Sequence, residues 1–298
     1  NEPPEGLAWD DIRYVIGGYN WKALFVNNDG FVVTGEAAQF NLESPTLEAG
    51  EEWVAFHPGE EVPYDCGTCH TTGYSPQDNQ EGLAGMVGTF SQPGVQCEAC
   101  HGPGSLHVNE PHAYTPRIVR AAQECRNCHM TSEVVAAGGF IQHTDLHYGD
   151  LFPGKHALID CVECHDPHAG VVAPREAREP YLRATCADCH FRAAQVQKPV
   201  HGNIRVDCVD CHMPEMIQVA QGDPESFTAD LPTHQVAINA TQIGQFAEDG
   251  SILPQIGLDF ACRQCHNAAQ GIGPVLADDV LLSVAQGFHE PQAAATEE

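Results

Sequence analysis

Basic residues are scarce in this 298-residue sequence. Thirteen lysines and arginines stand against 41 aspartates and glutamates, which gives a formal net charge of −28. Only three of the basic residues are lysines: Lys22, Lys155 and Lys198. So large an excess of negative charge repels phosphate backbones and anionic lipid headgroups, so binding to nucleic acid or to a membrane surface is disfavoured.

Long apolar runs are also missing. No stretch approaches the ~20 consecutive apolar residues that a membrane helix needs, so no membrane span is expected. The first residues, Asn1 to Glu5, contain neither the basic nor the apolar region of an export signal. The chain is therefore either cytosolic or already processed. Its hydrophobic share of 42% indicates a folded, water-soluble protein.

Cysteine, in contrast, is abundant, and its distribution is regular. All 14 cysteines fall in C-x-x-C pairs, and a histidine follows every pair at once. The seven motifs are Cys66/Cys69/His70, Cys97/Cys100/His101, Cys125/Cys128/His129, Cys161/Cys164/His165, Cys186/Cys189/His190, Cys208/Cys211/His212 and Cys262/Cys265/His266.

C-x-x-C-H is the attachment signature of c-type haem. The two thiols add to the haem vinyl groups as thioethers, and the adjacent imidazole reaches the iron from the same side. A structural zinc site needs two such pairs or a distant histidine pair, and zinc does not require a histidine after all seven pairs. Redox-active C-x-x-C pairs belong near a βαβ pattern, which is absent, and disulfides do not explain the histidines. We therefore expect seven covalently bound haems c, with the motif histidines as proximal iron ligands.

Seven haems in this length amount to about one per 43 residues, so porphyrin must replace much of the side-chain core. Their propionates would lower the net charge to about −35. Covalent haem attachment takes place outside the cytoplasm. We therefore expect an exported, extracellular protein whose signal peptide has been removed.

Ten histidines lie outside the motifs, and seven irons need seven distal ligands. All irons can thus be six-coordinate with two histidines, which leaves no open position for a substrate and favours electron transfer over catalysis. The expected distal ligands are His107, His143, His147, His156, His168, His201 and His234.

Position along the chain selects this set. His156 and His201 precede the next motif closely, His143 and His147 would share one face of a helical turn, and His234 stands alone in the 54-residue gap between Cys208 and Cys262. Three histidines remain: His57, His112 and His289. The strongest reserve among them is His289, which shares the apolar face of a closing helix.

The expected fold class is a multihaem cytochrome c, mostly coil with short helices around a haem chain, with a small N-terminal β-hairpin region. Strands are predicted at 13–16, 21–26 and 31–34, with a turn at 27–30. Helices are predicted at 117–128, about 181–197, and 277–289. Residues 1–60 form a β-rich segment, 61–170 a tetrahaem core and 171–298 a trihaem extension, within one continuous haem-packed unit.

Three segments resemble a known family. They are DIRYVIGG at 11–18, YDCGTCHTTGY at 64–74 and GVQCEACHGPGS at 94–105. They are similar to the N-terminal part of extracellular cytochrome nanowires of the OmcE and OmcS type, over about residues 11–170. The resemblance implies a continuous chain of stacked haems and a homopolymer with end-to-end haem contact, in which a histidine of one subunit completes a haem of the next. This chain departs from the tetrahaem pattern by its three further motifs.

The function expected is extracellular electron transfer, within a conductive filament, by a protein that is not an enzyme. Other cytochromes or extracellular acceptors would be its redox partners. Two alternatives stay open: a periplasmic or secreted multihaem oxidoreductase, and a soluble electron shuttle. An oxidoreductase usually needs one five-coordinate haem, and the absence of a C-x-x-C-K variant weighs against the pentahaem nitrite reductase type.

Overall fold

The computed structural model describes residues 2–19, 21–42, 52–118, 120–129, 135–142, 150–151, 154–169, 182–201, 206–269 and 272–289. These residues form two compact units, the first ending at Cys128 and the second beginning at His129. The boundary thus falls inside the third motif. The divisions expected at residues 60 and 170 remain predictions about the haem-loaded chain.

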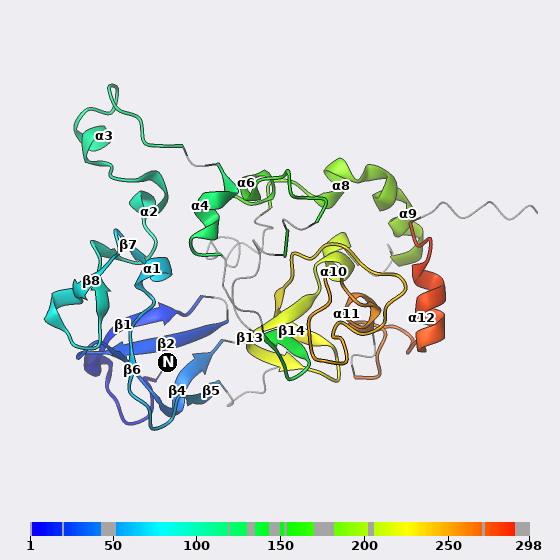
Figure 1. The fold of residues 1–298 in the computed structure, drawn as a ribbon, viewed down its shortest axis with the longest axis horizontal. Coiled ribbons are helices and arrows are strands. Elements are labelled where there is room, and N and C mark those ends of the chain that lie inside the picture. The colour runs from blue at the N-terminus through cyan, green and yellow to red at the C-terminus, as the bar shows by residue number, and fades with distance from the viewer. Residues whose placement is uncertain are drawn as a thin grey trace, which may run out of the picture. The chain divides into compact units, whose positions relative to one another are not determined.

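A six-stranded sheet dominates the start of the first unit (Figure 1). Its strand order is β5-β4-β2-β3-β6, and β1 also pairs with β2. The elements are the 3-10 helix η1 (Trp9–Asp11), β1 (Ile12–Gly17), β2 (Lys22–Asn27), β3 (Phe31–Val32), β4 (Gly35–Asn41), β5 (Trp53–Phe56) and β6 (Val62–Pro63). The three predicted strands are confirmed, but the expected small hairpin was too small, because three further strands extend it.

The turn between β2 and β3 forms as its sequence predicts. The Asn27 side-chain oxygen accepts hydrogen bonds from the backbone N–H groups of Asp29 and Phe31, both at 3.0 Å. Gly30 takes a φ of +90°, which glycine adopts at little cost. The turn sets Val26 and Val32 together in a buried cluster with Tyr64 and Met86.

The rest of the first unit carries short elements around the first three motifs. They are α1 (Gly67–His70), β7 (Thr71–Thr72), β8 (Ser75–Asn79), the 3-10 helix η2 (Gln80–Gly82), β9 (Val87–Thr89), β10 (Gln92–Pro93), α2 (Cys97–His101), α3 (Ser105–Asn109) and α4 (Ala122–Arg126). The helix predicted at 117–128 is confirmed only as α4, since Ala121 before it is extended.

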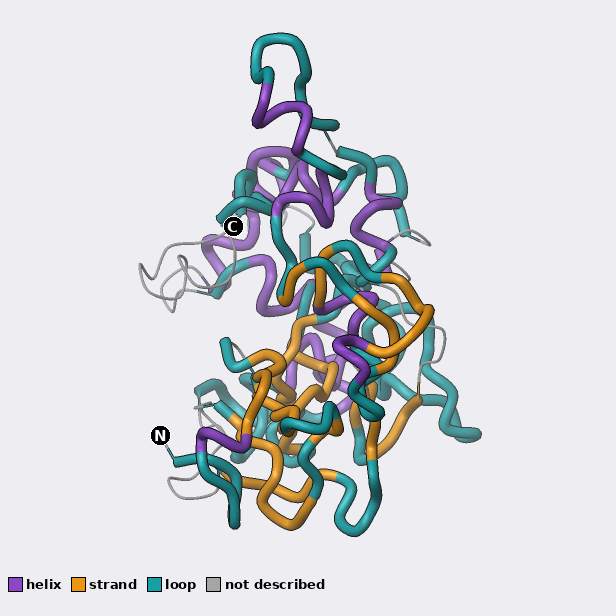
Figure 2. Tube along the Cα trace, turned by 90° about the vertical axis from the view of Figure 1, so that its left-hand side faces the viewer, coloured by secondary structure: helices purple, strands orange, loops and turns teal. Residues whose placement is uncertain are grey.

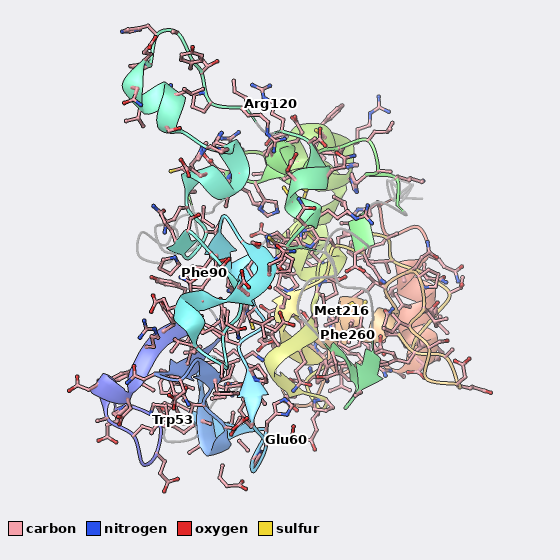
Figure 3. All side chains as sticks on the ribbon, turned by 60° about the vertical axis from the view of Figure 1, so that its left-hand side comes forward. Trp53, Glu60, Phe90, Arg120, Met216 and Phe260 are labelled. Atoms are coloured by element: carbon pink, nitrogen blue, oxygen red, sulfur yellow. The ribbon has the colours of Figure 1, made fainter. Side chains whose placement is uncertain are left out.

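The second unit contains a sheet that the sequence reasoning missed. Its order is β11-β12-β13-β14, with β12 parallel to β13 and the other pairs antiparallel. The strands are β11 (Val135–Ala137), β12 (Phe140–Gln142), β13 (Glu215–Asp223) and β14 (Thr228–Pro232). Met216 and Phe260, both buried, are labelled in Figure 3. The expectation of mostly coil with short helices is therefore only partly correct.

Short helices carry the motifs of the second unit, and loops separate them (Figure 2). They are α6 (Cys161–Cys164), α8 (Cys186–Cys189), α9 (Phe191–His201), α10 (Cys208–His212), α11 (Leu258–Arg263) and α12 (Asp278–Ala285). The helix predicted at 181–197 is two helices, because His190 leaves the helical conformation between α8 and α9. The helix predicted at 277–289 ends at Ala285, since Gln286 is extended and Gly287 has a φ of +72°.

Across the described ranges, no helix has the length and apolar character needed to cross a membrane.

Candidate haem-binding sites

One turn of helix places the three groups of a motif on one face. The backbone N–H of the motif histidine donates to the carbonyl of the first cysteine in the first, fourth, fifth and seventh motifs, at 2.8 to 3.0 Å. Residues i, i+3 and i+4 of such a turn are neighbours. Two thiols and one imidazole therefore converge on one group, and all 14 thiols are free.

Burial of the cysteines varies from motif to motif, which differs from the expectation of one closely packed unit. Nine cysteines are partly buried, and five are exposed: Cys97, Cys100, Cys164, Cys186 and Cys189. An exposed thiol is reached by an external group without any rearrangement of the chain. Protein side chains alone therefore do not enclose these five positions, and their roles in haem attachment stay predictions from the motifs.

The second motif departs furthest from the compact tetrahaem core expected at 61–170. Cys100 is exposed, as is every residue from 91 to 100, and α2 and α3 extend away from the sheet in Figure 1. Five-residue helices with polar and small side chains have little apolar surface to pack against that sheet. What holds the end of α2 is polar: Nη2 of Arg117 donates to the Cys100 carbonyl at 3.4 Å.

Backbone carbonyls orient several of the rings. Nδ1 of His101 lies 2.5 Å from the Arg117 oxygen, Nδ1 of His212 lies 2.8 Å from Val236, and Nδ1 of His266 lies 2.9 Å from Pro274. A carbonyl only accepts, so Nδ1 carries the proton and a neutral ring keeps its lone pair on Nε2. These bonds fix the tautomer and the direction in which Nε2 can bind a metal.

Each motif histidine from the fourth to the seventh motif faces a histidine from elsewhere in the second unit. The ring-centroid distances are 6.1 Å for His165 and His234, 5.9 Å for His190 and His156, 5.8 Å for His212 and His289, and 6.3 Å for His266 and His201. The angles between the ring planes range from 21° to 83°, so no common stacking geometry explains the four distances.

The spacing matches two imidazoles on opposite sides of one metal ion. An imidazole nitrogen lies about 2 Å from a first-row metal, and the ring centre lies roughly 1 Å beyond it, so two such rings are about 6 Å apart. In the described part of the chain, no three His, Cys, Asp or Glu side chains are arranged to hold a metal ion. Two imidazoles with two thiols suit a porphyrin, which supplies the other four nitrogens itself.

The environment of these rings fits the same group. The Nδ1 atoms of His156 and His201 are buried with no hydrogen-bond partner, which is unfavourable in a site made of protein alone. Burial, and then the facing His266, lowers the pKa of His201. Burial followed by His212 does the same to the pKa of His289. Both effects favour the neutral imidazole, the form that binds metals.

Large apolar side chains are exposed beside the motifs. Val95 precedes Cys97 by two residues and is 60% exposed, Leu158 precedes Cys161 by three and is 98% exposed, and Phe191 directly follows His190 and is 58% exposed. Exposed apolar surface of this kind marks a site for an apolar partner. Porphyrin faces attached at the adjacent cysteines are such partners.

The other expected distal ligands are placed differently. Nδ1 of His107 donates to the Tyr114 carbonyl at 2.7 Å, which keeps Nε2 available. The His168 side chain is 75% exposed, and its Nδ1 lies 3.7 Å from Asp166. His143 and His147 lie outside the described residues. His289 was only a reserve, yet it faces a motif histidine; the apolar face of α12 was the signal that pointed to it.

Consecutive motifs are close together in the first unit. The His70 and Gly94 backbones are bonded at 3.0 Å, and the Thr72 hydroxyl donates to Gly94 and accepts from the Gln96 N–H, both at 2.8 Å. These contacts join the first motif to the approach of the second. Sγ of Cys69 lies 3.9 Å from the Asn127 oxygen, and Sγ of Cys128 lies 4.0 Å from the Thr68 oxygen. The first motif therefore lies between the second and the third.

The series continues in the second unit. His129 of the third motif is close enough to His165 of the fourth to lower the pKa of that ring, after the larger effect of burial. Cys164 interacts with Cys189 of the fifth motif. Cys186 contacts Cys208 of the sixth motif, and Cys211 interacts with Cys262 of the seventh. The motifs of this unit therefore follow one another in space in their order along the chain.

Comparison with known proteins agrees with these features. The family model "Cytochrome c554 and c-prime" matches residues 43–102. The multihaem cytochrome MtrA of Shewanella baltica (strain OS185) is 26% identical over 172 aligned residues, covering 42% of this chain and 51% of the relative. The chain thus spans about half the length of this curated relative.

Two solved structures share the fold. The outer cell wall cytochrome OcwA matches with a TM-score of 0.55 and 16% identity over 95% of this chain and 78% of its own. The octahaem sulfite reductase MccA of Wolinella succinogenes matches with a TM-score of 0.54 and 16% identity, over 96% of this chain and 62% of its own. At such identities the likeness concerns the fold alone.

Motifs, facing imidazoles and relatives together define the class of the protein. The chain is a multihaem c-type cytochrome that binds haem c covalently.

Proposed function

We propose that the chain binds seven haems c and conducts electrons along them, without a catalytic site of its own. The observation that carries this proposal is the spatial series of motifs, second, first, third, then fourth to seventh, in which each motif lies beside the next. Haems attached in such a series form a continuous path. When bound, they supply the one-electron chemistry.

The protein's own residues hold and tune this path. Two imidazoles at each iron fill both axial positions, and backbone carbonyls such as that of Val236 orient the proximal ring. Carboxylates lie near the sulfurs: Asp210 interacts with Cys211 and Cys265, and Asp259 with Cys262. Negative charge beside an iron stabilises the ferric state, so we expect low reduction potentials.

Spectra of the purified, haem-loaded chain test this proposal. Mass spectrometry should give seven covalent haems, and the visible and electron paramagnetic resonance spectra of the oxidised protein should be low-spin throughout. A substantial high-spin signal at neutral pH would instead favour the oxidoreductase alternative. The shared fold with a protein titled a sulfite reductase makes sulfite the first substrate to assay; turnover of sulfite would contradict a purely electron-transferring role.

We place the protein outside the cytoplasm, where haem c is attached, with other cytochromes or extracellular acceptors as redox partners. The names of two relatives, a cell wall cytochrome and MtrA, support this placement. Trypsin digestion of intact cells, followed by haem staining, distinguishes a surface location from a periplasmic one, because only the exposed protein is degraded.

We further propose that copies associate end to end into a filament, which the resemblance of residues 11–170 to nanowire cytochromes supports. A chain with a net charge of −28 repels its copies, so an axial histidine donated across the interface is the directional bond we expect. Filaments should then persist in low salt and dissociate at acid pH, when histidine is protonated. Electron microscopy across pH and ionic strength tests this. Monomers under every condition would leave a soluble shuttle.

A further inference from the structure

We propose that His289 is the second axial ligand of the haem iron at the sixth motif, opposite His212. The assignment rests on the proposed haem-binding function and makes the function more specific. It belongs to a set in which His234 serves the fourth motif, His156 the fifth and His201 the seventh.

The first argument is the position of the two rings. Their centroids are 5.8 Å apart and their planes differ by 21°, although His212 and His289 are 77 residues apart in the sequence. Nδ1 of His212 is engaged by the Val236 carbonyl at 2.8 Å. The lone pair that remains, on Nε2, is therefore available to a metal rather than needed to hold the ring in place.

The second argument is the way α12 is fixed. Leu281 is fully buried, and Asp278 at the start of α12 forms an ion pair with Arg263 of α11, the helix that leads into the seventh motif. The turn after α12 then brings its last residues back toward the motifs, with Gly287 at a φ of +72°. This anchoring fixes the approach of His289 from both ends of a short segment.

The third argument is the neighbour of His289. The Phe288 ring meets His289 edge-on at 5.2 Å and stacks on His201 at 5.7 Å. In Figure 1, α9, which ends at His201, lies beside α12. Phe288 therefore separates two imidazoles that face different motif histidines, His212 and His266. Those two motifs are themselves adjacent through Cys211 and Cys262, so the two assignments support each other.

The assignment changes the distribution of ligands. With His289, His234, His156 and His201 serving the last four irons, four of the expected distal histidines remain for the first three motifs: His107, His143, His147 and His168. One of these four then exceeds the number of irons, so it can serve another purpose, such as completing a haem of a neighbouring copy.

The test uses the haem-loaded full chain with His289→Ala. Mass spectrometry should still count seven haems, because thioether attachment does not need the distal ligand. About one seventh of the low-spin ferric signal should become high-spin, and added imidazole should restore it. His289→Met should keep all irons low-spin and raise the potential of one haem, because thioether ligation raises potentials. The matched control is Gln286→Ala, an exposed position in the same turn, which should change neither spectrum.

Three results would overturn the assignment. They are a fully low-spin His289→Ala protein with seven haems, a high-spin signal that imidazole does not remove, and an equal spectral change in Gln286→Ala. None of them touches the proposed function, which fails only if the unmodified chain lacks covalent haem or does not transfer electrons.

Discussion

His165 and His234 face each other with ring centroids 6.1 Å apart, although they are 69 residues apart in the sequence. The loop that carries His234 is held by Asp150, whose carboxylate accepts hydrogen bonds from the Thr233 hydroxyl at 2.9 Å and from the His234 backbone N–H at 3.4 Å. The histidine that stands alone in the longest gap between motifs is thus placed by a carboxylate from a distant segment.

We predict that His234→Ala affects one haem, the one at the fourth motif, and leaves the other six low-spin. Electron paramagnetic resonance of the oxidised protein should show roughly one seventh of the iron becoming high-spin, because one imidazole is lost. The matched control is Gln235→Ala, which removes a side-chain oxygen that is buried without a hydrogen-bond partner. A complete low-spin spectrum in His234→Ala would reject the role of His234.

Thr233→Val tests the anchor of that loop. Thr233 is fully buried, and burial raises the pKa of the Asp150 carboxyl while the Thr233 hydroxyl lowers it. Removing the hydroxyl leaves the buried carboxylate with one donor fewer, so the unfolding free energy should fall by about 1–3 kcal/mol. Denaturant unfolding measures the loss. Thr241→Val, at an exposed position, should change it by less than about 0.5 kcal/mol.

Gly30→Ala should destabilise the first unit through contact as well as backbone conformation. A Cβ at Gly30 would lie 2.4 Å from Cγ of Met86, and the residue has a φ of +90°. Gly59 has a φ of +79° and nothing within 4 Å of the same position, so Gly59→Ala reports the backbone cost alone. That cost is about 1–2 kcal/mol. Thermal unfolding should show a clearly larger loss for Gly30→Ala; equal losses would mean that Met86 moves aside freely.

Asp259 should make stability depend on pH. Burial raises its pKa from 3.8 to about 6, although the Phe260 and Gln245 backbone N–H groups oppose this. The folded state therefore holds the proton more tightly than the unfolded state, and stability is lost as the pH rises from about 4 to about 6. The loss is at most about 3 kcal/mol.

In Asp259→Asn that pH-dependent loss should disappear, because the amide cannot ionise, while its oxygen still accepts one of the two hydrogen bonds. Unfolding midpoints of both proteins across pH 4 to 7 test this. Parallel pH profiles would show that other groups cause the dependence.

Local patterns predicted the first three strands well. Residues 12–17 alternate between partly buried and exposed positions, and the Asn27–Gly30 turn has the side chain and the glycine that its conformation needs. The sheet of β11 to β14 escaped prediction because its pairing depends on distant partners. Ile141 pairs in parallel with Ile217, 76 residues further on, and the Asp230 carboxylate accepts three backbone N–H groups of residues 219–221 across the hairpin.

The sequence by itself determined the chemistry of attachment. Two thiols and an imidazole at i, i+3 and i+4 meet on one helical turn whatever the rest of the chain does, so C-x-x-C-H is informative without a fold. How far the chain encloses each motif, with Cys100 exposed and Cys66 partly buried, was decided only by the tertiary structure.

Which histidine faces which motif was likewise decided by the tertiary structure. The four facing pairs are separated by 34 to 77 residues, and such contacts depend on how sheets, caps and buried side chains fold the loops back. That is why His289 ranked as a reserve in the sequence and faces His212 in the structure.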